Sequence, residues 1–114
     1  MPYIEAKLSI KLNDNQMDEL QKQLTEAVSS AFSKPKSYIM TNIEVGTNMF
    51  MGGSRVEKGA YIVVRSLGSV SKPVCQIATK GICDILTTEY GLSGTNVYIT
   101  YHPVDFWGWN GSMF

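Results

Sequence analysis

Residues 61–67 read YIVVRSL, and five of these seven side chains are apolar. A short apolar run rich in β-branched residues is typical of a strand that is covered on both faces. We therefore place a buried strand near the middle of the chain. The segments on either side of it are expected to supply the elements that cover it.

A strand–helix–strand pattern precedes this run. Residues 2–10 alternate apolar and polar side chains, as in a half-buried strand, and residues 39–45 do so again. Between them, Asn13 and Asp14 are candidate N-caps, and Lys34-Pro35 ends the predicted helix because a residue before proline avoids the helical region. Apolar residues of this helix recur at helical spacing: Met17, Leu20, Leu24, Val28 and Phe32. Residues 46–59 are rich in turn signals and are expected to hold one short strand.

The same pattern follows the run. Ser71 is the expected N-cap of a second helix, and Gly91 suits its C-terminal end. Residues 97–101 alternate as another strand, and their sequence VYITY resembles the SYIMT of residues 37–41. The predicted buried stripe of the second helix comprises Val74, Ile77, Ala78, Ile82, Ile85 and Leu86.

The chain is thus a duplicated βαβ unit, with parallel strands expected inside each unit. Both helices on one face of the sheet give a two-layer sandwich of the α/β (α+β) class. A chain of 114 residues forms a single domain, residues 1–114. The other sheet face carries apolar residues such as Val63, and we expect oligomerisation to cover it.

Composition excludes several classes of partner. The formal net charge is zero, and the sequence pI of about 6.5 argues against nucleic acid or an anionic membrane as the main partner. The sequence shows no apolar run of transmembrane length and no signal-peptide pattern, so we expect a cytoplasmic protein. Cys75 and Cys83 lie roughly 12 Å apart along a helix, too far for a disulfide, and are expected to be buried thiols. With His102 interpreted as an ordinary loop histidine, we expect neither a metal site nor a cofactor.

Six motifs, in order along the chain, carry a specific resemblance. They are MPYIEAKLS at the start, SKPKSYI at the end of the first helix, GGS, VRSLGS, VYITY and the closing GWNGSMF. Together they resemble the macrophage migration inhibitory factor (MIF) family, to which D-dopachrome tautomerase also belongs. The match runs from Pro2 to Phe114, with about one extra residue before the first helix.

This resemblance implies a homotrimer of the tautomerase superfamily whose sheets form an inner barrel. It also implies keto–enol tautomerisation of phenylpyruvate-like and dopachrome-like compounds, so the expected substrate is a small aromatic keto or enol acid. Animal members act as secreted cytokines released without a signal peptide. Secretion by a non-classical route and a cell-surface receptor are therefore further expectations.

The resemblance also assigns Pro2 as the catalytic base. An initiator methionine before proline is normally removed, which leaves a free secondary amine. To accept a proton near neutral pH, this amine must have a lowered pKa, which an apolar pocket and a nearby cation both provide. Trp109, Phe114 and Lys34 are the residues expected to provide them. The alternative is that Pro2 only begins a strand, where its missing N–H costs nothing.

Further substrate-binding residues are carried over from the family. Lys34 is expected to pair with a substrate carboxylate, beside Tyr38 in the same turn; alternatively it is a solvated lysine at a helix end. Leu67 is expected to offer its backbone amide, and Ser66 is its neighbour. Tyr98 and Thr100 share one face of a strand and are expected to reach into the pocket of a neighbouring subunit.

Three departures from the family pattern concern specificity and redox chemistry. Thr100 stands where better-known members carry asparagine, and Trp107 stands where a smaller aliphatic is common, so an altered substrate preference is expected. The Cys-x-x-Cys of some members reads Gly59-Ala60-Tyr61-Ile62 here, and without two thiols we predict no thiol–disulfide activity. Two other functions stay open: a non-enzymatic signalling or binding protein with an idle pocket, and an unrelated enolising or dehalogenating enzyme.

Overall fold

A four-stranded sheet forms the framework of the molecule, with the strand order β2-β1-β5-β6. The computed structural model describes residues 1–114. β1 (Pro2–Leu8) runs parallel to β2 (Met40–Glu44), and β5 (Ala60–Leu67) runs parallel to β6 (Val97–Val104). β1 and β5 pair antiparallel and join the two halves. The predicted parallel pairing inside each βαβ unit is confirmed.

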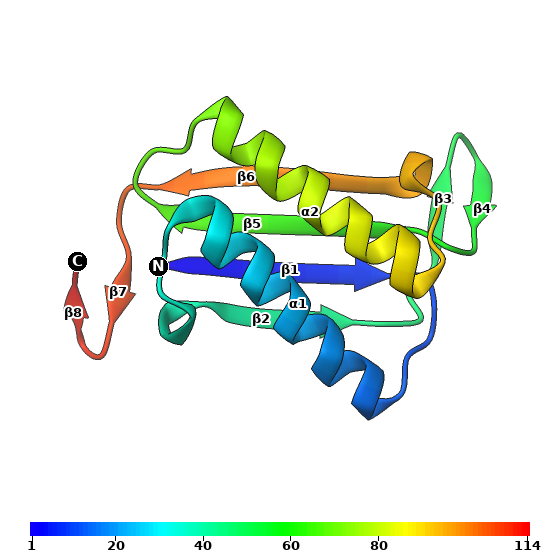
Figure 1. Ribbon diagram of the computed structural model, residues 1–114, viewed down its shortest axis with the longest axis horizontal. Helices are drawn as coiled ribbons and strands as arrows, with labels where there is room; N and C mark the ends of the chain where they lie inside the picture. Colours follow the sequence, from blue (N-terminus) through cyan, green and yellow to red (C-terminus); the bar gives the residue numbers. More distant parts are fainter.

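Both helices lie on the same face of this sheet, which gives the predicted two-layer sandwich (Figure 1). α1 (Asp14–Phe32) begins with a capping box in which Asn13 and Gln16 bond each other's backbone N–H groups. α2 (Lys72–Tyr90) begins at Ser71 and ends at Gly91, whose φ of 71° is the left-handed conformation that glycine adopts readily. Both predicted caps of α2 are confirmed.

The hydrophobic core fills the space between the helices and the sheet. Along β5, the alternate residues Ile62 and Val64 point into it and are at most 1 % exposed. The largest fully buried aliphatic side chains are Ile4, Leu8, Leu20, Leu24, Val28, Ile62, Val64, Ile82 and Leu86. Three strands and two helices contribute to this cluster, so the core ties both βαβ units together.

The opposite face of the sheet is more polar than expected. Tyr61 and Arg65 of β5 are exposed on it, so β5 is not covered on both faces in the single chain. Val63, between them in β5, is only 8 % exposed. Lys7 and Glu44 form an ion pair on adjacent strands of the same face. The open face of the single chain is therefore mixed in polarity, with Met40, Tyr61 and Tyr98 exposed on it beside these charged groups, and oligomerisation stays a prediction.

Two hairpins extend from opposite ends of the sheet (Figure 1). β3 (Met49–Met51) and β4 (Ser54–Val56) form one, where only one short strand was expected. The turn between them forms because Gly52 and Gly53 both have positive φ. β7 (Gly108–Trp109) and β8 (Ser112–Met113) form the other, beside the start of β1. Single 3-10 turns, Lys36–Tyr38 and Gly94–Asn96, precede β2 and β6.

Several element bounds differ from the prediction. α1 ends at Phe32, before Lys34-Pro35, because Ser33 takes a left-handed conformation with φ 55°. β1 ends at Leu8, where the Ser9 side chain bonds the backbone of Gly59. β2 begins only at Met40, because the Lys36–Tyr38 turn precedes it.

Four single residues also depart from their predicted surroundings. β6 continues to Val104, so His102 lies in a strand and not in a loop. Ile77, expected in the buried stripe of α2, is 61 % exposed because it lies on the solvent side of that helix. Cys75 and Cys83 are free, as predicted, but only half-buried.

Candidate active site

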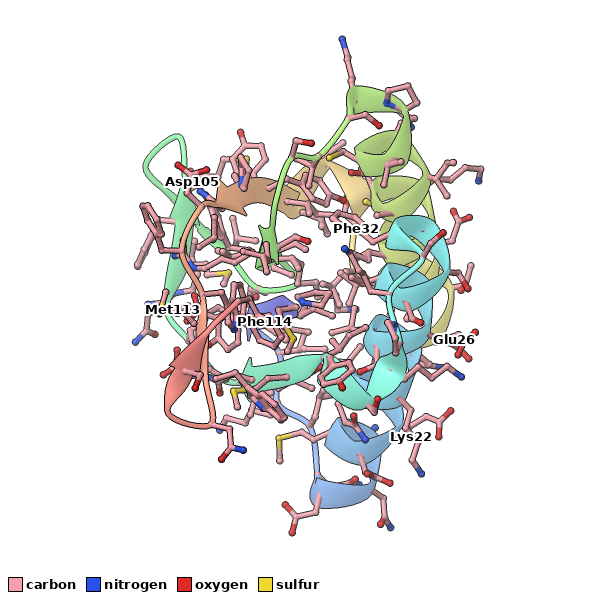
Figure 2. All side chains as sticks on the ribbon, turned by 90° about the vertical axis from the view of Figure 1, so that its left-hand side faces the viewer. Lys22, Glu26, Phe32, Asp105, Met113 and Phe114 are labelled. Carbon is pink, nitrogen blue, oxygen red and sulfur yellow. The ribbon has the colours of Figure 1, made fainter.

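A cleft of about 670 Å³ opens at the end of the sheet where β1 begins. Pro2 and Tyr3 of β1 form its floor, and Tyr38 stands at one side. Trp107, just before the C-terminal hairpin, and Trp109, within it, also line the cleft. Figure 2 looks onto this end, with the hairpin in front of the strand ends and Phe114 labelled on it. Residues from both ends of the chain thus meet here.

Three aromatic rings form a cluster, and two of them, Tyr38 and Trp109, line the cleft. Tyr38 meets Trp109 edge to face, with ring centroids 6.1 Å apart, and Trp109 stacks on Phe114 at 5.8 Å. The Phe114 N–H donates to the Trp107 carbonyl at 3.0 Å, which fixes the last residue against the hairpin. The hairpin turn suits its sequence, because Asn110 and Gly111 both have positive φ, as a two-residue turn between strands requires. The aromatic residues of the C-terminal tail therefore pack against Tyr38, in the turn that follows α1.

Pro2 is buried at the first position of β1, opposite Ser66 of β5. Its nitrogen is joined to Met1, which also lines the cleft. The Leu67 N–H donates to the Met1 carbonyl at 3.2 Å. The backbone amide that the sequence assigned to substrate thus lies beside the N-terminus and is occupied by Met1.

Lys34 lies in a smaller hollow of about 270 Å³, which Ser66 also lines. It is not part of the wall of the larger cleft. Burial lowers the pKa of the Met1 amine below its ordinary value, and the positive charge of Lys34 lowers it further. Lys34 is therefore close enough to the chain terminus to disfavour a positive charge there.

Tyr98 and Thr100 are not brought to this cleft within one chain. Tyr98 is 58 % exposed and lines a separate pocket beside the β3–β4 hairpin. It pairs with Tyr61, which pairs with Lys7, five residues along β1 from Pro2. Five residues of strand span about 17 Å. Thr100 lies two residues further along β6, opposite Val63. Its hydroxyl oxygen accepts a hydrogen bond from the Tyr61 hydroxyl and lies 2.9 Å from His102 Nε2.

Comparisons with known proteins place the chain in a family. The model of the macrophage migration inhibitory factor (MIF) family matches residues 1–114. The chain belongs to the MIF family. It is 32 % identical over 116 residues to a macrophage migration inhibitory factor from Xenopus laevis. That match covers 100 % of this chain and 99 % of the relative.

Two further similarities extend the comparison. The D-dopachrome decarboxylase of Gallus gallus is 29 % identical over 94 % of this chain and 90 % of its own length. Among solved structures, Leishmania major MIF2 superimposes with a TM-score of 0.91 at 26 % identity, covering 100 % of this chain and 97 % of that one. The MIF fold therefore extends over the whole chain, including the C-terminal hairpin.

Some residues of the cleft were missed by the sequence analysis. Met40, Tyr3 and Arg65 lie in one row across β2, β1 and β5, on the open face, and all three line the cleft. Their positions follow from the register of β1 against β5, which no motif of this MIF-family sequence encodes. Because side chains alternate along a strand, the sequence does predict that Arg65 lies on the sheet face opposite Ile62 and Val64. It does not predict that Arg65 lies beside Tyr3.

No three His, Cys, Asp or Glu side chains lie close enough together to hold a metal ion. Neither α1 nor α2 combines the length and the apolar composition that crossing a bilayer requires.

Proposed function

We propose that this protein is a keto–enol tautomerase for phenylpyruvate-like and dopachrome-like compounds, with the Pro2 amine as general base after Met1 is removed. The observation that carries the proposal is the position of Pro2, buried at the start of a strand and lining an aromatic cleft. Membership of the MIF family supports it. So does the similarity to a relative named for D-dopachrome.

The proposed chemistry needs one base and no cofactor. A neutral proline nitrogen takes a proton from the carbon next to the substrate carbonyl, and the proton is returned on the oxygen. The reverse order converts the enol to the keto form, so atoms and charges balance. The proline ring holds the backbone on one side of the nitrogen and thereby fixes the direction of the lone pair. Tyr38, Trp109 and Phe114 would pack against the aryl group and exclude water.

Lys34 is proposed to keep the Pro2 amine neutral. The same cation lowers the pKa of the Met1 amine, and after Met1 is removed it faces the Pro2 amine instead. A neutral base is required, so activity should fall as the pH drops through the Pro2 pKa.

Replacing Lys34 by alanine should therefore raise the Pro2 pKa and move the acidic limb of the kcat/KM profile to higher pH. The control is Lys36→Ala, because Lys36 is in the same turn but pairs with Glu26. A profile that does not move in Lys34→Ala would contradict this role.

The decisive experiment compares the same chain with and without Met1. While Met1 is attached, the Pro2 nitrogen is an amide and cannot accept a proton. We expect protein that retains Met1 to be inactive, and treatment with methionine aminopeptidase to restore enol–keto conversion as mass spectrometry shows the residue leaving. Equal rates for the two forms would overturn Pro2 as the base.

We further propose that the site is completed in a homotrimer. Tyr98 is offset from the Pro2 of its own chain by about 17 Å along the strands, and Thr100 by about 10 Å, and neither lines the cleft. A neighbouring copy would bring them to the cleft. Sedimentation should give three times the 12.6 kDa of one chain, and a stable monomer with full activity would exclude the shared site.

A further inference from the structure

The cleft holds a charged group for which the proposed mechanism has no use. Arg65 is the one charged side chain among the eleven residues that line it. Its guanidinium belongs to none of the four ion pairs of the chain. Glu5, the acidic residue nearest along β1, instead accepts a hydrogen bond from the Tyr3 hydroxyl at 3.5 Å.

Arg65 and Lys34 approach the N-terminus from opposite faces of the sheet. Adjacent residues of a strand point to opposite faces, and Ser66 is 2 % exposed on the helix side. Lys34 lines the small hollow together with Ser66, so it lies on that helix side. Arg65 lies on the open face, paired with Tyr3. One carboxylate therefore cannot bind both cations.

We propose that Arg65 binds a second anionic group of the ligand, so that the cleft prefers a dianionic aryl acid to a monoanionic one. This rests on the proposed function for the aryl keto acid as ligand, but the anion site itself needs no turnover. An arginine presents a planar fork of donors that matches a carboxylate in two parallel hydrogen bonds. With one carboxylate near Lys34 and the ring against Trp109, the far end of the ligand reaches the open face.

The test measures binding of inert probes to protein from which Met1 has been removed. Phenylacetate carries one carboxylate, 4-carboxyphenylacetate carries two, and 4-methylphenylacetate adds bulk without charge. None has a keto group, so none is turned over. Tryptophan fluorescence or calorimetry gives the Kd of each.

We expect wild-type protein to bind the dianion about tenfold more tightly than either monoanion, as one charge-assisted bidentate pair allows. Arg65→Gln should abolish this preference and leave the affinity for phenylacetate unchanged. Lys34→Gln should weaken all three probes and keep the preference. The matched control is Arg55→Gln, which removes the same charge from β4, where Arg55 packs over Phe50 in the distant hairpin.

A wild-type preference near one, or a preference that survives in Arg65→Gln, would overturn the proposal. Circular dichroism of each variant ensures that a folded protein is titrated. The same experiment separates failure of this proposal from failure of the tautomerase function. If the protein shows an Arg65-dependent preference but no enol–keto activity, the anion site stands and the tautomerase function is wrong. If it shows enol–keto activity but no preference, the tautomerase function stands and the anion site is wrong.

Discussion

Replacing Pro2 by glycine is expected to lower the rate of enol–keto conversion at least a hundredfold. General bases contribute about 10²–10⁴-fold to catalysis, and no other strong base lines the cleft: its remaining side chains are aromatic or aliphatic, apart from a serine and a guanidinium. Glycine leaves a primary amine on a mobile residue, so the direction of the lone pair is lost. The measurement is kcat/KM for phenylpyruvate, on protein whose N-terminus is verified by mass spectrometry.

Loss of activity must be separated from loss of the cleft. The side chain of Pro2 is buried, so its removal could alter the start of β1. We therefore expect Pro2→Gly to bind phenylacetate with the wild-type Kd and to keep the wild-type circular dichroism spectrum. A variant that binds normally and also converts enol at the wild-type rate would end the idea of Pro2 as the base. It would favour a signalling or binding protein with an idle pocket.

Replacing Ile62 by alanine is expected to destabilise the fold by about 2–5 kcal/mol, the range for removing a buried aliphatic side chain. Ile62 is fully buried in β5, between β1 and β6, and belongs to the core that joins both units. The lost methyl groups leave a cavity that the rigid sheet cannot close. Urea unfolding should give a lower midpoint with an unchanged slope.

Ile77→Ala is the matched control for this prediction. The substitution is the same, but Ile77 is 61 % exposed on α2, so we expect a cost of less than about 1 kcal/mol. Equal costs for the two variants would contradict the burial assigned to them. It would also indicate that Ile77 is covered in an assembly.

The elements follow from local patterns of the sequence. The strand patterns are the alternation of residues 2–8 and the apolar run of residues 61–67. Helical spacing around Leu24 and Ile82, and the caps at Asn13 and Gly91, likewise depend on a few neighbouring residues. The ends of an element differ from the prediction where they depend on pairing with a segment distant in the sequence. β6 continues to Val104 because β5 pairs with it as far as Leu67. Pro103 had indicated that the strand ends earlier.

Local sequence patterns predict only part of the candidate site. Pro2, Tyr38, Trp109 and Phe114 were predicted from a resemblance, and all four are found at the cleft or stacked on its wall. Lys34 is near the terminus but in a separate hollow. Tyr98 and Thr100 do not line the cleft of their own chain. The family resemblance implies that they reach the cleft of a neighbouring subunit instead.

The two βαβ units, the helix caps and the aromatic residues of the tail can be predicted from the sequence, because they depend on residues close together in the chain. The pairing of the two units cannot, because it depends on contacts between distant segments. The antiparallel register of β1 on β5 places Ser66 and Arg65 beside Pro2 and Tyr3. The structure also leaves Tyr61 and Arg65 exposed on the open face of the single chain, where the apolar run of residues 61–67 suggested a covered strand. Side-chain register across strands is set by packing of the whole core, and no local pattern contains it.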